Sequence, residues 1–280
     1  MIAGLVLVLG GAAAGLFGSL LGLGGGILLV PLMTLVFGLP LREAVAISLI
    51  SVIVTSSASA AVYLERHVAN LRLGMTLELF SAAGALVGGL VAFMIDEQIL
   101  AGLFAALLTW VAISMVRRKD PPKAGAAAPV EAALIADAAP STADDGSFAA
   151  SLSGPGYRVH RIPLGMAGSV VAGLNSALLG VGGGIIKVPV MHLVMGVPLR
   201  TSTATSNMMM GITAVSSAVI YLLRGEIDPF IAGPIALGVF VGASTGPRLA
   251  HRIPVKVLRG LFVIVLVYTA FQMARKALGI

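Results

Sequence analysis

The sequence has no cysteine and few charged residues, and both shortages narrow the class of protein. Without cysteine among its 280 residues, the chain forms no disulfide framework and no thiolate metal site. Charged residues make up 11% of the chain, against about 25% in a soluble domain. Because 58% of the residues are hydrophobic, the chain cannot cover a water-exposed surface. We expect a multi-pass protein of the cytoplasmic (inner) membrane, in contact with the lipid bilayer.

Catalytic and nucleotide-binding patterns are also missing. The chain holds no Walker-type glycine loop, no nucleophile–base arrangement and no cluster of metal-ligand residues. We therefore expect neither an enzyme nor an ATP-driven pump, and no cofactor. The net charge of +6 comes from basic residues between apolar stretches, which indicates membrane orientation and not nucleic-acid binding.

An internal repeat is the most informative feature that is present. Residues 15–48 and 173–206 align without a gap, 158 positions apart, and about 20 of the 34 positions are identical. Each copy lies in almost uncharged sequence and is divided by three consecutive glycines. A duplicated apolar unit with a broken helix is typical of secondary transporters whose substrate site lies between the repeats.

Apolar stretches of about 20 residues predict membrane spans. The single spans are Ala44–Leu64, Leu73–Ile95, Gln98–Val116, Thr201–Leu223, Pro229–Pro247 and Val257–Ala274. Each repeat also opens with a longer apolar stretch, 2–41 or 163–199, which the glycines divide into a re-entrant helix–turn–helix or two joined spans. We predict an all-α polytopic membrane protein with a first repeat at 1–116, a second at 163–280, and a flexible, Ala/Pro/Ser-rich linker at 117–162.

Basic residues predict the orientation. The cluster Arg117, Arg118 and Lys119 places the linker in the cytoplasm. The loop with Asp96 and Glu97 carries no Lys or Arg. Its counterpart in the second repeat carries Arg248, Arg252, Lys256 and Arg259. This opposite bias predicts inverted repeats, with both termini outside.

The glycine triplets predict a substrate site at the breaks. They are Gly24, Gly25 and Gly26 in the first repeat and Gly182, Gly183 and Gly184 in the second. Each glycine destabilises a continuous helix by about 1 kcal/mol relative to alanine, and glycine permits positive φ. Helices that restart at Ile27 and Ile185 would direct free N–H groups into a cavity suited to an anion. Alternatively, the glycines only permit tight helix crossing.

Polar side chains near the breaks are candidate ligands for such an anion. Lys187 is a charged residue within the apolar segment that follows the second triplet, and a charge in such a place suggests a functional site. The alternative is a lysine whose side chain extends to the membrane surface. Amide and hydroxyl donors suit oxyanion oxygens, or else bond to neighbouring helices. The residues concerned are Ser48, Asn175, Thr205, Ser206 and Asn207.

Three further residues are candidates for a proton relay or a gate. His192 lies within an apolar segment and could relay protons, or it is a neutral imidazole bonded to a neighbouring helix. Arg42 and Arg200 each follow a Gly-x-Pro-Leu turn, as interfacial anchors or as gate residues. Glycines four positions apart predict helix packing, either inside the bundle or in a homodimer. They are Gly84 with Gly88 and Gly242 with Gly246.

The paired motifs SLLGLGGGILLVPLM and ALLGVGGGIIKVPVM, with TATSNMMMGITA after the second, resemble those of the TauE/SafE family of sulfite exporters, also called the toluene-sulfonate uptake permease family. The resemblance covers both repeats. It implies a carrier of sulfite or organosulfonates, with the glycine triplets and Thr205, Ser206 and Asn207 in the family motif. Phe17 and Leu49 stand in the first repeat where the second has Asn175 and Asn207, which makes the site asymmetric.

The prediction is a secondary transporter that moves sulfite or a small organosulfonate anion outward by alternating access around a midplane site. One alternative is an uptake carrier for another sulfur anion or small solute. The other is a membrane scaffold or receptor without transport, whose linker binds a partner.

Overall fold

The protein is a bundle of helices. The computed structural model describes residues 2–21, 25–65, 69–117, 151–154, 156–249 and 255–279. Across these ranges the chain is mostly helical, and the only extended pairing is a bridge between Gly154 and Tyr157. Five of the described helices are long and apolar enough to cross a membrane. The predicted multi-pass helical membrane protein is therefore confirmed.

The helices fall into two sets that follow the two sequence repeats. The first set is α1 (Ile2–Leu21), α2 (Gly26–Leu35), α3 (Leu41–Glu65), α4 (Leu71–Ala92) and α5 (Glu97–Arg117). The second is α8 (Ile162–Leu179), α9 (Gly184–Pro189), the π-helix η1 (Val190–Val194), α10 (Leu199–Leu223), α11 (Pro229–Leu249) and α12 (Val255–Ala277). Each of the six predicted single spans overlaps one of these helices.

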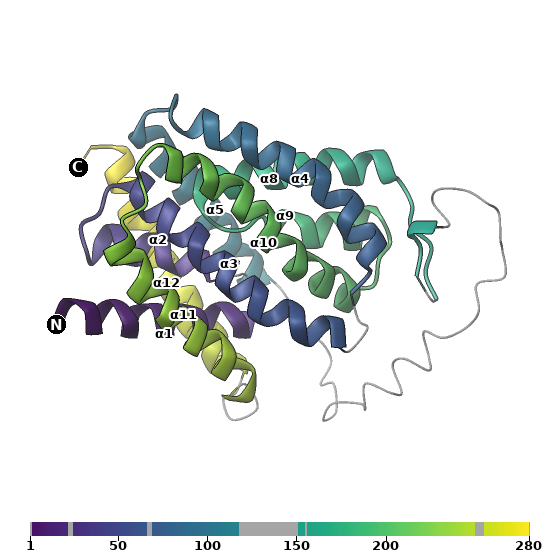
Figure 1. The fold of residues 1–280 in the computed structure, drawn as a ribbon, viewed down its shortest axis with the longest axis horizontal. Helices are drawn as coiled ribbons and strands as arrows, with labels where there is room; N and C mark the ends of the chain where they lie inside the picture. The colour runs from purple at the N-terminus through teal and green to yellow at the C-terminus, as the bar shows by residue number, and fades with distance from the viewer. Residues whose placement is uncertain are drawn as a thin grey trace.

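Each set packs its first helix against the other set (Figure 1). Helix α1 lies along α11, and α8 lies along α4. A Cβ built at Gly242 would lie 2.0 Å from the carbonyl oxygen of Ala12, and one built at Gly84 would lie 2.2 Å from that of Val170. Ala12 and Val170 are themselves 158 positions apart, like the two glycines. The small residues therefore serve the same close helix crossing twice, inside the bundle.

One helix offers a matched pair of variants that tests this packing. We expect Gly242→Ala to lower the midpoint of thermal unfolding in detergent, because overpacking costs about 1–3 kcal/mol. Gly233→Ala, in the same helix, meets nothing within 4 Å. We expect it to be neutral or stabilising, since alanine favours helix by about 1 kcal/mol. Equal midpoints for the two variants would contradict the crossing.

The central helices α3 and α10 pack together and run in opposite directions. At one end, the ring of Phe93 lies 5.6 Å from the Arg42 guanidinium at the start of α3 and 5.0 Å from that of Arg224 just after α10. At the other end, the N–H of Asn70, which precedes α4, donates to Thr205 Oγ1 near the start of α10. These two helices, which stand at equivalent places in the repeats, are thus antiparallel.

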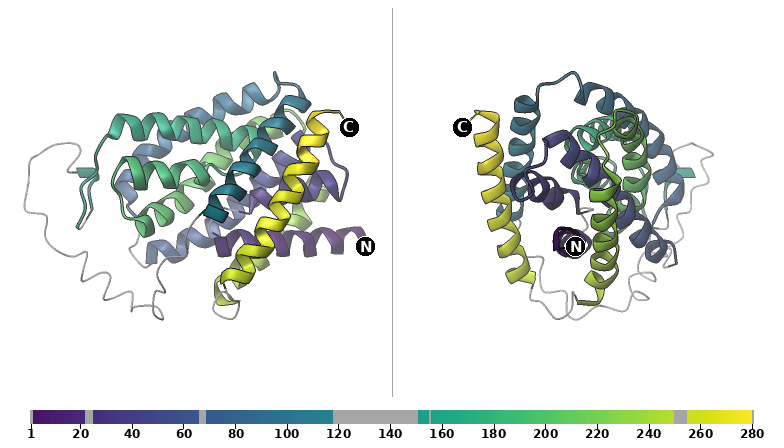
Figure 2. Two further views of the ribbon diagram at one scale, coloured as in Figure 1. Left: turned by 180° about the vertical axis from the view of Figure 1, so that it is seen from behind. Right: turned by 60° about the vertical axis from the view of Figure 1, so that its left-hand side comes forward.

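Both termini lie at one end of the bundle, and the chain enters α8 at the other end (Figures 1 and 2). The part of the predicted linker at 118–150 lies outside the described residues. The stretch 151–161 was predicted to be flexible, but Leu152 and Val159 are buried in an apolar cluster with residues of α4 and η1. The few apolar side chains of this stretch thus pack against the helix ends, and the flexibility of the linker as a whole stays a prediction.

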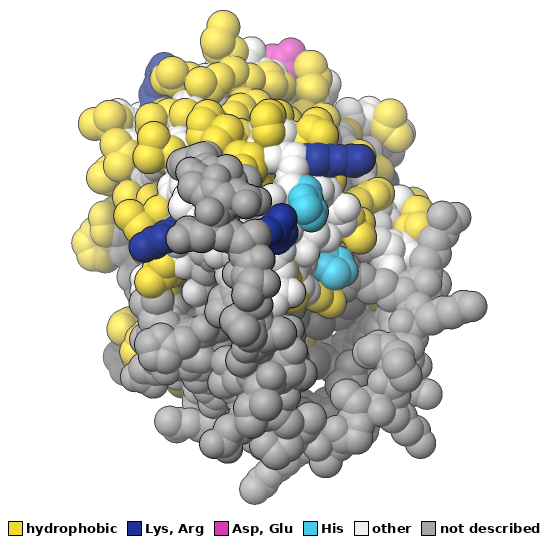
Figure 3. All heavy atoms as spheres, turned by 90° about the vertical axis from the view of Figure 1, so that its right-hand side faces the viewer, with side chains coloured by type: hydrophobic (Ala, Val, Ile, Leu, Met, Phe, Trp, Pro, Cys, Tyr) yellow, Lys and Arg dark blue, Asp and Glu magenta, His cyan; other side chains and the backbone are white. Residues whose placement is uncertain are grey.

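The surface of the described helices is apolar around the bundle. Leu79, Leu237 and Phe271 are among many large hydrophobic side chains that are exposed. Figure 3 shows such side chains around the end where α8 begins, together with basic side chains and histidines. The exposed basic residues at this end are Arg72, in the first turn of α4, and Arg158 and Arg161, before α8. An apolar belt with charges at the helix ends is the surface expected of a protein in a bilayer.

Candidate functional site

The second glycine triplet interrupts the helices between α8 and α9. Gly180, Gly182 and Gly183 have φ of 68°, 77° and 71°, in the left-handed region. Helix α8 ends at Leu179 and α9 starts at Gly184, with Gly183 as its N-cap. Only glycine adopts this sequence of conformations without strain. The triplet therefore sets a sharp turn that brings α9 back toward α8.

The first triplet begins α2 in the same way. Gly25 is the N-cap, with φ of 75°, and the helix starts at Gly26. Gly24 lies outside the described residues. Both short helices thus begin one residue before the predicted starts at Ile27 and Ile185. The first N–H groups of a helix have no acceptor within it. Binding of an anion by the N–H groups of Ile27 and Ile185 stays a prediction.

The two breaks touch each other. A Cβ built at Gly26 would lie 2.2 Å from the carbonyl oxygen of Gly180. Ser48 Oγ, on α3, donates to that oxygen at 2.7 Å and lies 3.3 Å from the oxygen of Gly26. Ser48 therefore ties the breaks together, and an anion does not fit between these two backbone segments in this conformation.

Unpartnered polar groups lie on the helices next to the second break. Among the described residues, the buried atoms Asn175 Nδ2, Ser176 Oγ and Ser206 Oγ have no hydrogen-bond partner. The Ser206 hydroxyl lies 3.4 Å from a Cβ built at Gly184, and the Ser176 Cβ lies 3.5 Å from one built at Gly183. A buried polar group without a partner costs about 1–3 kcal/mol. The predicted role of Asn175 and Ser206 as anion ligands stays a prediction, and Ser176 joins them as a further unpartnered group.

Lys187 is buried and paired, which the sequence did not reveal. It is 2% exposed, and Nζ lies 2.9 Å from Glu78 Oε2 on α4 and 2.6 Å from Thr213 Oγ1 on α10. The Thr213 hydroxyl in turn donates to Glu78 Oε1 at 2.6 Å. The ion pair thus joins α4, α9 and α10, and Glu78 balances the lysine charge in this conformation. The signal in the sequence that could have indicated this pair was Glu78, an acidic residue inside the apolar span Leu73–Ile95, because such a residue needs a partner in the membrane.

Three other candidates make contacts away from these unpartnered groups. Thr205 Oγ1 accepts from the N–H of Asn70, so it fixes the start of α4. Asn207 is buried, and its carbonyl oxygen accepts from Ser56 Oγ on α3. His192 is exposed on η1, with Nδ1 2.9 Å from the carbonyl oxygen of Val197. This placement separates the histidine from the break, so a relay there gains no support from its contacts.

Comparison with known proteins gives the family. The model of the family described as "Sulfite exporter TauE/SafE" matches residues 7–273. The chain belongs to the TauE/SafE family. It is 25% identical over 275 residues to the probable membrane transporter protein YunE of Bacillus subtilis, with 96% of each chain covered. It is 27% identical over 287 residues to the probable membrane transporter protein MamO of Paramagnetospirillum magneticum, covering 97% of this chain but 44% of MamO. No solved structure matches.

The predicted gate residue of this TauE/SafE protein, Arg42, lies in a cluster at the end that holds the termini. Its Nη2 donates to the carbonyl oxygen of Ile95 at 2.8 Å, and its guanidinium lies over Phe93. The Tyr221 ring lies tilted against the Phe93 ring, with centroids 5.1 Å apart, and its hydroxyl donates to the carbonyl oxygen of Ala177 in α8. The cluster connects both repeats beyond the second break. The Arg200 side chain lies outside the described part of the chain.

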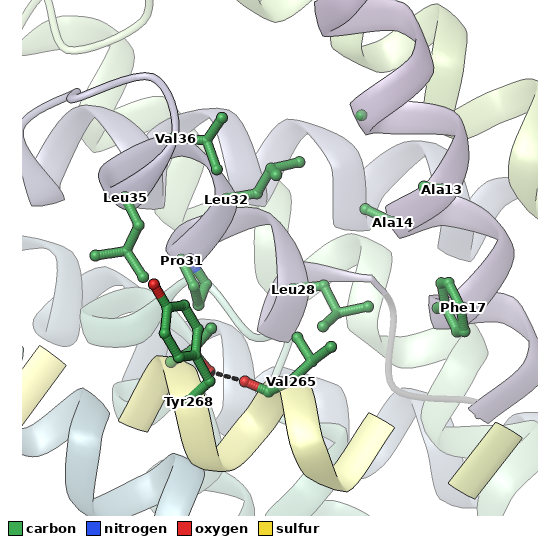
Figure 4. Close-up of a pocket in the computed structure, with 12 residues that line it drawn as sticks. Ala13, Ala14, Phe17, Leu28, Pro31, Leu32, Leu35, Val36, Val265 and Tyr268 are labelled. Carbon is green, nitrogen blue, oxygen red and sulfur yellow. Dashed lines mark hydrogen bonds between the residues drawn. The ribbon is translucent and has the colours of Figure 1, made fainter. Parts of the chain in front are cut away.

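An apolar cavity of about 310 Å³ lies between α1, α2 and α12. Figure 4 shows Leu28, Pro31 and Leu32 of α2 facing Phe17 of α1 and Tyr268 of α12. Charged groups are costly to bury among such side chains. This cavity of the TauE/SafE protein is therefore unsuited to an anion, although it leaves α2 without close neighbours on one side.

Proposed function

We propose that this protein is a secondary transporter that carries sulfite or a short organosulfonate through the membrane. The chain is a membrane transporter of the TauE/SafE family, and the family description supports sulfite as substrate. The observation that carries the proposal is the group of unpartnered polar atoms at the second glycine break, on Asn175, Ser176 and Ser206. They lie on α8 and α10, on either side of the turn that leads into α9.

The chemistry of these groups fits a small oxyanion. An amide N–H and two hydroxyls donate hydrogen bonds without a fixed charge. Bonds to a charged acceptor are the stronger kind, about twice as strong as neutral ones. An anion at this break would pair all three donors and lie close to Lys187, which follows Gly184 by less than one helical turn. The short helix α9 would then contribute to anion binding mainly through the Lys187 side chain.

Alternating access follows from two halves of inverted topology. The antiparallel course of α3 and α10 and the duplicated crossing of α1 on α11 and α8 on α4 support this relation. In such carriers one half moves relative to the other around a fixed site. Contact between Gly26 and Gly180 would close the site, and separation of the breaks would open it.

The orientation and the direction of transport are part of the same proposal. The end of the bundle where α8 begins carries Arg72, Arg158 and Arg161. The predicted linker, whose first residues are basic, leads along the chain to this end. The positive-inside rule supports placing this end in the cytoplasm. The family description as an exporter supports outward transport.

Flux into proteoliposomes tests the proposal. We expect purified protein to transport sulfite, methanesulfonate or sulfoacetate faster than sulfate or chloride, with protein-free vesicles as the baseline. Asn175→Leu, which removes one of the unpartnered donors at the break, should abolish the flux while the protein still inserts and unfolds cooperatively. No protein-dependent flux of any sulfur anion would contradict the proposal.

A further inference from the structure

We propose that Glu78 is a tethered counter-ion that competes with the substrate anion for Lys187, so that each anion binds together with one proton on Glu78. The inference rests on the proposed function, because it specifies how anion binding at the second break is coupled to an ion. It assigns a role to a buried carboxylate that the anion site itself does not use.

The geometry shows a closed ion pair deep in the bundle. Glu78 is 4% exposed and Lys187 is 2% exposed. Both Glu78 oxygens are occupied, one by Lys187 Nζ at 2.9 Å and the other by the Thr213 hydroxyl at 2.6 Å. Thr213 lies near the middle of α10 (Leu199–Leu223), so the pair lies far from both ends of that helix. Glu78 and Thr213 hold the Lys187 ammonium group in this conformation, so an anion at the break would compete with Glu78 for it.

Unpartnered hydroxyls lie on both sides of the pair. Ser81 is one turn from Glu78 on α4, and its buried Oγ has no partner within the described ranges. Ser206 is two turns from Thr213 on α10, beside Gly184. One unpartnered hydroxyl therefore lies at the break and another lies one turn from Glu78. The flexible stem of lysine would allow its ammonium group to move from Glu78 toward an anion.

Charge balance couples this movement to a proton. The closed pair has no net charge, and an added anion would leave one negative charge unpaired in the membrane interior. Breaking a buried ion pair is strongly unfavourable because one charge is left uncompensated. A proton from water added to the Glu78 carboxylate removes that charge, and Lys187 keeps its own proton and pairs with the anion. The site that holds protonated Glu78, Lys187 and the anion then has no net charge.

No other charged group in the surrounding described helices competes for this role. Helix α4 packs against α8 and α10. Helix α8 contains no charged or titratable residue. On α10 the titratable residues are Arg200, at its start, and Tyr221, whose hydroxyl is bonded to Ala177. On the neighbouring η1, His192 is exposed.

The pair exists in one half only. At the positions 158 residues earlier or later, the first repeat has Leu29 for Lys187 and Ala236 lies in α11 where α4 has Glu78. The threonine is kept, as Thr55. One chain therefore holds one such pair, which gives one proton for each anion. Anion and proton then cross as a neutral set, so efflux follows the anion gradient and the pH difference and not the membrane potential.

Titration calorimetry measures the proton directly. Methanesulfonate is added to the wild-type protein in buffers of different ionisation enthalpy, because this anion of a strong acid brings no proton of its own. We expect uptake of one proton per anion, and an affinity that falls about tenfold for each pH unit in the alkaline range. Glu78→Gln should bind without proton uptake and without this pH dependence. Glu226→Gln, which removes a carboxylate outside the pair, should behave as wild type.

The outcomes separate the coupling from the function. Binding to the wild type without proton uptake would overturn the coupling, as would a Glu78→Gln variant with unchanged pH dependence. If Glu78→Gln does not fold, the wild-type proton count and the effect of an imposed potassium-diffusion potential on wild-type flux still decide. Potential-driven flux contradicts the inference. If neither methanesulfonate nor sulfite binds or is transported, the proposed function itself fails.

Discussion

Replacement of Lys187 by methionine is expected to abolish anion transport and to destabilise the protein by about 3–5 kcal/mol. The change leaves Glu78 and the Thr213 hydroxyl buried without the ammonium group that lies 2.9 Å and 2.6 Å from them. Methionine keeps the length and the apolar contacts of the lysine stem. The loss therefore reports the charge and not the packing. Thermal unfolding in detergent and flux into proteoliposomes measure the two effects.

The double variant Glu78→Leu with Lys187→Met separates stability from function. Removing both charges eliminates the uncompensated carboxylate, and such apolar replacements are often neutral or stabilising. We expect the midpoint of unfolding to return to or above that of the wild type, while transport stays lost. A double variant that transports sulfite or a sulfonate normally would show that the ion pair has no role in transport.

Gly26→Ala is expected to stop transport as well, for a reason of space and not of charge. The added Cβ would lie 2.2 Å from the carbonyl oxygen of Gly180 and 2.8 Å from Ser48 Oγ. A backbone oxygen cannot move aside without separating α2 from the end of α8. We expect the contact between the breaks to be lost, with a cost of about 1–3 kcal/mol or more.

Gly4→Ala is the matched control for this variant. A Cβ at Gly4 meets nothing within 4 Å, and the residue lies in the first turn of α1. The control should keep both the flux and the midpoint of unfolding. Near-normal flux through Gly26→Ala would contradict a closing contact between the glycine breaks.

The sequence predicted the helical elements because composition alone determines them in a membrane. Uninterrupted apolar stretches such as Gln98–Val116 become helices since lipid leaves no other way to pair the backbone. Gly182 and Gly183, which have positive φ in the structure, cannot continue a helix at low cost. Family membership was predictable from the repeated motif.

The contacts that define the site could not be predicted in the same way. Glu78 and Lys187 are 109 residues apart in sequence, and periodicity along one helix does not identify a partner on another. Ser176 resembles any small membrane serine until its hydroxyl proves to be buried without a partner. Thr205 looked equivalent to Ser206, but one helical position turns it toward Asn70 and α4. Pairing across helices depends on rotation and crossing, which the sequence encodes only indirectly.

The central claim is that the second glycine break is an anion site formed by neutral donors. The most direct measurement is the stabilisation of purified protein by sulfite, which raises the unfolding midpoint by mass action if the folded state binds it. Ser206→Ala and Ser176→Ala remove hydroxyls that have no partner within the described structure, so neither costs an internal hydrogen bond. Ser57→Ala, exposed on α3, is the control.

We predict that sulfite stabilises the wild type and Ser57→Ala equally. It should bind each of the two break variants about tenfold more weakly, because a hydrogen bond to a charged group contributes about 1.5–3 kcal/mol. Equal stabilisation of all four proteins by sulfite would contradict an anion site at the second glycine break.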